Sequence, residues 1–137
     1  MSTLAYMLDT SVLIDLLRAT SRPIRAKFQA AAGRIGVSTV SVMELEYGIA
    51  RSNDPVGNRE KTESLLRLTQ ILPFTLDAAQ NAGQAPSVLA TSGMSIGLFD
   101  SLIAGHARSQ GLVLVTNNVR EFESVPDLLV ENWLVAI

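Results

Sequence analysis

Short apolar runs alternate with amphipathic segments along the whole chain, and this alternation predicts strands that are each followed by helices. Residues 4–8 form an apolar run of strand length, and residues 11–19 continue at the helical period. Further strands are expected near 33–38, 71–74, 112–115 and 128–130, and further helices near 23–31, 39–51, 54–70, 75–91 and 97–110. We therefore predict an α/β fold, with a central parallel sheet of about four to five short strands flanked by helices on both faces.

Three carboxylates interrupt apolar segments of this pattern. Asp9 follows the strand at 4–8, at a strand's carboxyl end, where open α/β sheets place ligand sites. Glu44 and Asp100 are expected on the inward faces of their helices. The neighbours on these faces are Val40, Met43 and Tyr47 for Glu44, and Ile103, Ala104 and Ala107 for Asp100. Each acid alone is explained by a helix cap or a structural ion pair, but three together favour a shared site.

Carboxylates that lie close together in an apolar setting require a cation or a proton. The chain has no cysteine and one histidine, so the donors are hard oxygen ligands of the kind that Mg²⁺ or Mn²⁺ prefers. Such an ion activates water and stabilises charge on a phosphoryl oxygen. Hydrolysis of a phosphodiester is therefore the reaction that we expect.

Other hydrolytic chemistries lack their residues in this chain. A two-histidine ribonuclease is excluded because His106 is the only histidine, and we expect it at the surface or as a helix cap. The sequence contains neither a Gly-x-Ser-x-Gly elbow nor a phosphate-binding loop with Lys-Ser/Thr.

The charge distribution is uneven although the net charge is only −2. Between Leu16 and Met43 the chain has no acid but carries five basic residues: Arg18, Arg22, Arg25, Lys27 and Arg34. Such a segment suits contact with a polyanion such as RNA. A solvated basic helix face explains it equally well.

The length of 137 residues fits one domain spanning 1–137. We find no signal peptide and no apolar run of about 18 residues, so a cytoplasmic location with no membrane contact is expected.

Four motifs and the C-terminal Glu131-Asn132-Trp133 resemble the PIN-domain ribonucleases, specifically the VapC toxins of bacterial type II toxin–antitoxin pairs. The motifs span residues 7–18, 38–48, 97–107 and 115–122, in the order and spacing of that family. The last two pieces are most similar to the VapC branch that cleaves initiator transfer RNA.

The resemblance implies a PIN-domain fold and a toxin that acts as a Mg²⁺-dependent endoribonuclease, with Mn²⁺ as a substitute. It also implies a homodimer, inhibition by a cognate VapB antitoxin, and contact with operator DNA only through that antitoxin. We expect a VapB helix to fill an apolar groove between the helices at 11–31 and 54–70. A second copy is expected to bury part of 75–91 or of 97–110.

The resemblance also assigns roles to residues. It implies that Asp9, Glu44 and Asp100 are the acidic metal ligands. Further, Thr10 or Ser11 would position a water at the metal, and Thr116 would lie at the floor of the site. The chain departs from the pattern at Asn118, where many PIN domains have an aspartate. Glu121, three residues on, is the candidate for the missing carboxylate.

Two alternatives remain at this point. The first is a catalytically silent PIN-like module that binds RNA or regulates, in which the acids are structural; Asn118 is the feature that favours it. The second is a structure-specific DNA nuclease, which the short chain disfavours because it lacks room for an arch or a clamp.

Overall fold

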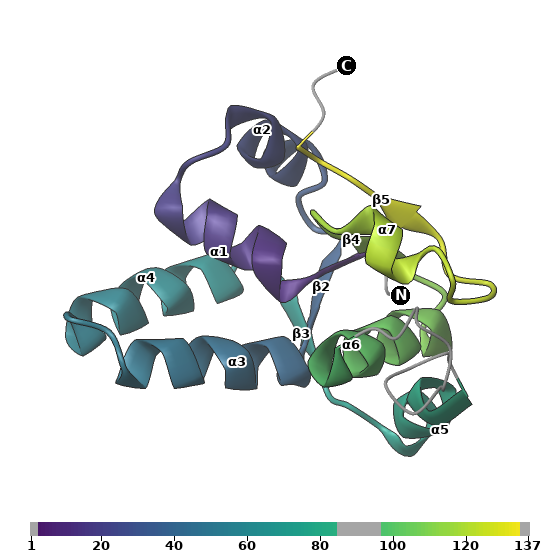
Figure 1. Cartoon of the computed structure of the whole chain (residues 1–137). Helices are drawn as coiled ribbons and strands as arrows, with labels where there is room; N and C mark the ends of the chain where they lie inside the picture. Colours follow the sequence, from purple (N-terminus) through teal and green to yellow (C-terminus); the bar gives the residue numbers. More distant parts are fainter. Residues whose placement is uncertain (1–2, 85–96, 135–137) are drawn as a thin grey trace.

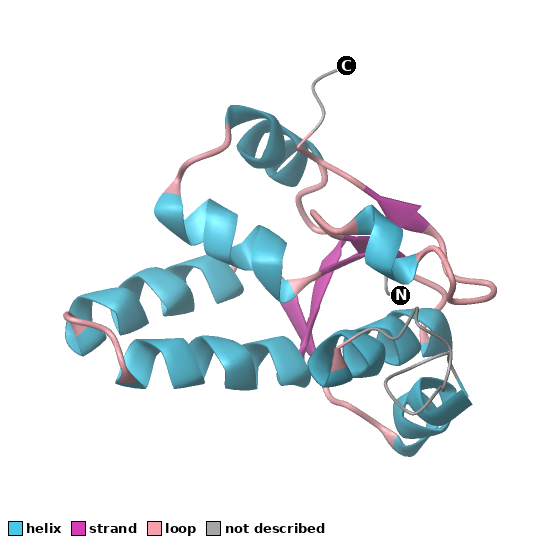
Figure 2. Ribbon diagram, viewed as in Figure 1, coloured by secondary structure: helices cyan, strands magenta, loops and turns pink. Residues whose placement is uncertain are grey.

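The structure is a computed structural model that describes residues 3–84 and 97–134. Strands and helices alternate along it, as Figures 1 and 2 show. The elements are β1 (Tyr6–Leu8), α1 (Thr10–Arg18), α2 (Arg22–Ala30), β2 (Ile35–Ser38), α3 (Thr39–Ala50), α4 (Pro55–Leu66), β3 (Gln70–Leu72), α5 (Leu76–Gln84), α6 (Leu98–Ser109), β4 (Val113–Val115), α7 (Val119–Phe122) and β5 (Val130–Glu131). None of the helices described is long and apolar enough to cross a membrane.

The five strands form one parallel sheet in the order β3-β2-β1-β4-β5. β1 lies at its centre, with Tyr6 opposite Ile35 on one side and Val113 on the other. The carboxyl ends of β1, β2 and β4 therefore meet at one edge of the sheet. The predicted α/β architecture is confirmed.

Apolar side chains cover both faces of the sheet. Met7 and Leu8 are both fully buried and point to opposite faces, as neighbours in a strand do. Met7 packs with Ile103 and Ala107 of α6, whereas Leu8 packs in the cluster formed by α1, α2 and α3. Helices on both faces thus hold the carboxyl edge of the sheet rigidly.

Polar side chains begin the two helices that leave the centre of the sheet. The Asp9 carboxylate accepts the backbone N–H of Thr10 and caps α1. The Ser38 hydroxyl accepts the backbone N–H of Val40 and caps α3. Each cap follows its strand directly, so the side chains of the first helical turn lie beside the carboxyl edge.

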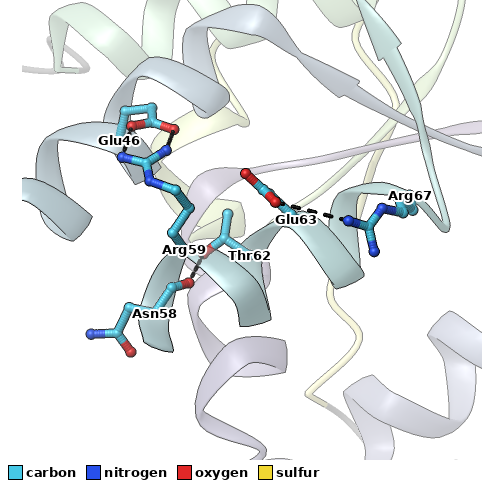
Figure 3. Close-up of polar contacts among 6 residues, drawn as sticks. All are labelled: Glu46, Asn58, Arg59, Thr62, Glu63 and Arg67. Atoms are coloured by element: carbon cyan, nitrogen blue, oxygen red, sulfur yellow. Dashed lines mark hydrogen bonds and ion pairs between the residues drawn. The ribbon is translucent and has the colours of Figure 1, made fainter. Parts of the chain in front are cut away.

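An ion pair between exposed side chains joins α3 to α4 (Figure 3). The Arg59 guanidinium donates to both carboxylate oxygens of Glu46, at 2.5 and 2.8 Å. Glu46 is exposed, unlike Glu44 on the same helix, which is half-buried. Exposed pairs of this kind contribute little to stability, because water screens the two charges.

Some predicted boundaries differ from the structure. The helix predicted to reach residue 70 ends at Leu66, because the chain turns through Thr69 into β3, which begins at Gln70 rather than at 71. The helix predicted over 75–91 begins at Leu76 and is described to Gln84. The remainder of that predicted helix, residues 85–91, lies outside the described residues.

The predicted inward face of α3 is partly wrong. Met43 and Tyr47 are 44% and 57% exposed. The buried stripe runs through Ser41, Leu45 and Ile49 instead, because α4 and α1 pack on that side. Glu44 is half-buried at the border of this stripe.

The predicted inward face of α6 is confirmed, but two of its residues have unexpected neighbours. His106, expected at the surface, is fully buried, and its Nδ1 lies 2.8 Å from the Ser38 Oγ. Burial lowers the pKa of His106, against a smaller opposing effect of the Pro73 backbone. Gly105 faces α5, where a Cβ atom would clash with the Ala82 backbone. Both arrangements arise because α6 is enclosed between the sheet and α5.

Candidate functional site

The paired ends of β1 and β4 bring Asp9 beside Thr116. Leu8 pairs with Val115, and the Asp9 backbone N–H continues the ladder to the Val115 carbonyl at 2.9 Å. The Thr116 hydroxyl donates to Asp9 Oδ2 at 2.8 Å, and the Ser11 hydroxyl donates to the same oxygen at 3.2 Å. Asp9 is only 3% exposed. Its orientation is therefore fixed by hydrogen bonds from the first turn of α1 and from the residue that follows β4.

Burial raises the pKa of the Asp9 carboxyl above its ordinary value. The hydrogen bonds from Thr116, from the Thr10 backbone and from Ser11 oppose this effect, and the charge of Glu121 adds to it. None of these five contributions comes from a basic residue of the described chain, although the Asp9 oxygens accept several hydrogen bonds.

A chain of hydroxyl groups connects α1 to Glu44 on α3. Thr10 Oγ1 lies 2.7 Å from Glu44 Oε1 and 2.9 Å from Ser41 Oγ. The single Thr10 proton can be donated to one acceptor only. Since Glu44 in its ionised form can only accept, the order is Ser41 to Thr10 to Glu44. This relay turns the Glu44 carboxylate toward the start of α1, where Asp9 lies.

Asp100 and Glu121 form the second half of the cluster. Burial raises the pKa of Asp100 to about 7, helped by the charge of Asp9, by a hydrogen bond with Glu121 and by the charges of Glu121 and Glu44. Glu121 Oε1 also accepts the backbone N–H of Gly97, the cap residue of α6, at 3.1 Å. The carboxyl group of Asp100 therefore lies within reach of the charges of three other carboxylates.

The short helix α7 places Glu121 in this cluster. Asn118 is its cap residue, and the Asn118 backbone N–H donates to Thr116 Oγ1 at 3.0 Å. The Asn118 side chain is exposed and makes no capping hydrogen bond. The expectation that a short helix opening at Asn118 brings Glu121 toward the site agrees with the electrostatic contact between Glu121 and both Asp9 and Asp100.

The four carboxylates are suitable ligands for a hard divalent cation, because their donor atoms are oxygens. A cation would also relieve the repulsion between their charges. In the described part of the chain, no three Asp, Glu or His side chains are grouped so as to hold a metal ion as they stand. Burial and the charges of the other carboxylates together raise the pKa of Asp100, and a bound cation would oppose the effect of those charges.

The predicted basic residues are dispersed over α1 and α2. Arg18 lines a groove of about 440 Å³ that also includes Glu44 and is walled by Ile14, Leu17 and Ile49. Lys27 lines a separate hollow, while Arg22 and Arg25 are exposed on α2. The groove lies between α1, α3 and α4; the expectation of a wall from α2 is wrong, because α3 supplies that wall.

Ser41 and Asn117 were not anticipated as parts of this site. Ser41 is fully buried and reaches Glu44 through Thr10. Asn117 Nδ2 donates to Asp15 Oδ2 at 2.6 Å and so ties the loop after β4 to α1. A signal for Ser41 was its position one helical turn before Glu44, as a small polar residue in an apolar stretch.

Comparison with known proteins agrees with this architecture. The chain matches the PIN domain family over residues 6–128. The tRNA(fMet)-specific endonuclease VapC of Shigella flexneri is 40% identical over 130 residues, which cover 95% of this chain and 98% of the relative. Ribonuclease VapC2 of Haemophilus influenzae is 40% identical over 131 residues, covering 96% and 99%.

A solved structure has the same fold over nearly the same length. A chain of the DNA-bound VapBC crystal structure from Salmonella typhimurium superposes with a TM-score of 0.88 at 38% identity, covering 95% of this chain and 98% of the other. PIN-domain ribonucleases are generally metal-dependent. This chain belongs to the PIN-domain family and, within it, to the VapC ribonucleases of toxin–antitoxin pairs.

Proposed function

We propose that this chain is the toxin of a VapBC pair and cleaves initiator transfer RNA in a Mg²⁺-dependent reaction in the cytoplasm. The observation that carries the proposal is the cluster of Asp9, Glu44, Asp100 and Glu121 at the carboxyl edge of the sheet, with Asp100 at a pKa of about 7. The Shigella flexneri relative, named for its specificity toward tRNA(fMet), supports this choice of RNA.

Asp9, Glu44 and Asp100 would hold the ion, and Glu121 would complete its charge balance. When bound, the divalent cation supplies activation of water and stabilisation of charge on the phosphoryl oxygen. Thr116 and Ser11 fix the Asp9 carboxylate by donating to it, and the Ser41–Thr10 relay does the same for Glu44. Because metal ligands must be deprotonated, a bound cation would favour the ionised form of Asp100.

Cleavage of total RNA tests this function. Purified protein freed of antitoxin is incubated with total cellular RNA in Mg²⁺, Mn²⁺ or EDTA, and new RNA ends are mapped by sequencing. We expect ends at one position in initiator transfer RNA with either metal and none in EDTA. The same ends in EDTA would contradict the metal proposal, and ends spread over all RNA would contradict the substrate.

A catalytically silent RNA-binding module is the second candidate, and one observation favours it. Asn118 stands where many PIN domains carry an acid, so the site has lost a charge unless Glu121 replaces it. The module would bind initiator transfer RNA with equal affinity in Mg²⁺ and in EDTA and would produce no new ends. The cleavage experiment therefore separates the two candidates directly.

We also propose that a segment of a VapB antitoxin fills the groove between α1, α3 and α4 and that the toxin acts as a homodimer. The groove has apolar walls and is also lined by Glu44, Arg18 and Lys61, so an occupant with apolar anchors flanked by charged side chains fits it. Leu17→Glu should reduce co-purification with the antitoxin. Leu129→Glu, an equal change at an exposed leucine of the loop before β5, should leave co-purification unchanged.

A further inference from the structure

Two segments separated in sequence line one polar hollow beside the carboxylate cluster. β4 and β5 are parallel, and Val115 pairs with Glu131, so the residues that follow each strand emerge side by side at the edge where Asp9 lies. α7 lies against β5 at this edge (Figure 1). The hollow measures about 400 Å³ and is lined by Asn117, Asn118, Val119, Arg120, Glu121 and Asn132.

The lining of this hollow is mostly polar. It contains three amide side chains and a guanidinium, and its only acid is Glu121, which also belongs to the carboxylate cluster. A hollow of this size lies within the range of ligand sites, about 300–1,000 Å³. It therefore has room for a ligand that continues from the cluster itself.

The three amide side chains differ in which of their hydrogen-bonding groups are unpaired. The amino group of Asn117 is engaged by Asp15, whereas Asn117 Oδ1 is buried and has no hydrogen-bond partner in the part of the chain that the structure describes. The Asn132 Oδ1 accepts the backbone N–H of Leu134 at 2.7 Å. The amino group of Asn132 remains as a donor. The Asn118 amide makes no capping bond and offers both a donor and an acceptor.

Arg120 supplies the positive charge of this hollow. Its side chain is exposed, and among the residues described it has no ion-pair partner. A guanidinium that is not paired with a carboxylate is suited to bind a phosphate group through two parallel hydrogen bonds. A ligand that extends from the carboxylate cluster to Arg120 is therefore expected to carry an anionic group for Arg120. It is also expected to carry hydrogen-bonding atoms for the neighbouring amides.

We propose that this hollow binds one unpaired nucleotide of the RNA substrate, next to the phosphodiester that is cut. The inference rests on the function proposed above and adds the element that selects the cleavage position. Asn118 and Asn132 contact the edge of the base, and Arg120 binds the flanking phosphate. Unpaired bases are recognised in this way, through hydrogen bonds to their edges in a pocket, because the bases of paired RNA are inaccessible.

The test measures kcat/KM on initiator transfer RNA with a single abasic position on one or the other side of the mapped cut. Asn132→Asp keeps the oxygen that Leu134 needs and removes the amino donor. Arg120→Gln removes the charge alone. Asn53→Asp and Arg67→Gln are matched changes at exposed positions that do not line this hollow.

We expect the wild-type enzyme to lose about tenfold in kcat/KM when the base on one side is absent, as the loss of one good base contact does. Asn132→Asp should lose about as much on intact RNA and nothing further on that abasic RNA. Arg120→Gln should lower kcat/KM on both the intact and the abasic RNA, while the two control variants should match the wild type.

Two results would overturn the subsite. One is wild-type kcat/KM for Asn132→Asp and Arg120→Gln on intact RNA. The other is that removal of the base lowers kcat/KM for Asn132→Asp by as much as for the wild type, on each of the two abasic RNAs. A wild-type protein that cleaves no RNA in either metal would instead contradict the proposed function.

Discussion

Thr116 and Asp9 are 107 residues apart in sequence, and the Thr116 hydroxyl donates to Asp9 Oδ2 at 2.8 Å. The same hydroxyl oxygen accepts the backbone N–H of Asn118 at 3.0 Å. One buried side chain thus orients the central carboxylate of the cluster and the cap residue of α7, the helix that carries Glu121. Second-layer groups of this kind set the direction of the lone pairs that reach a metal.

Thr116→Val should lower cleavage roughly 10- to 100-fold, because Val has nearly the shape of Thr but cannot donate to Asp9. The loss should appear as a higher Mg²⁺ concentration for half-maximal rate, measured by titration. Thr116→Ser, which restores the hydroxyl, should recover most of the activity. Equal Mg²⁺ titration curves for Thr116→Val and wild type would show that the hydrogen bond does not serve the metal site.

The raised pKa of Asp100 predicts a pH-dependent stability of the metal-free protein. The folded state holds this proton up to about pH 7, whereas the unfolded state releases it near pH 4, so the folded state binds more protons between these values. The free energy of unfolding should therefore fall as the pH rises from about 4 to 7. Asp100 is half-exposed, so with allowance for solvent screening the effect is on the order of 1 kcal/mol.

Asp100→Asn should remove this dependence, because the amide does not titrate. Urea unfolding of both proteins in EDTA at pH 5 and pH 8 measures it. We expect the variant to be more stable than wild type at pH 8 and similar at pH 5. An equal difference between the two proteins at both pH values would contradict the assigned pKa.

Glu121→Gln should reduce cleavage, by roughly tenfold at limiting Mg²⁺ and by less at saturation. The amide keeps an oxygen for the Gly97 N–H but removes the fourth charge of the cluster. Asn118→Asp, the opposite change, should lower the Mg²⁺ concentration needed for half-maximal rate. Identical titrations for Glu121→Gln and wild type would remove Glu121 from the site.

Replacing Arg22, Arg25 and Lys27 together by Gln should weaken RNA binding without moving the cut. Each lost phosphate contact should lower the slope of log affinity against log salt by roughly 0.7–0.9. Filter binding between low and high salt measures the slope, with Arg67→Gln as the single-charge control. An unchanged slope would show that the RNA does not contact α2. The RNA would then contact other basic side chains, such as Arg51, Arg59 and Arg120.

The sequence predicted those parts of the site that depend on strand ends. Asp9 and Thr116 both follow apolar runs predicted as strands of one parallel sheet, so both are expected at its carboxyl edge. The place of Thr116 at the floor of the site came from the resemblance to the PIN-domain family, and its contact with Asp9 required the strand order. The environment of His106 was not predictable, because a helical period assigns a face without saying which element covers it. Met43 and Tyr47 were placed inward for the same reason, whereas α4 packs on the other side of α3.

The direct test of the carboxylate site compares Asp9→Asn and Asp100→Asn with wild type on initiator transfer RNA in Mg²⁺. Asp77→Asn, at an exposed acid of α5, is the matched control, and circular dichroism verifies the fold of each protein. Because a metal contributes several kcal/mol to such a reaction, we predict at least about a 100-fold loss for both site variants and none for the control. Cleavage by either folded site variant at a rate close to that of wild type would contradict the assignment of these carboxylates.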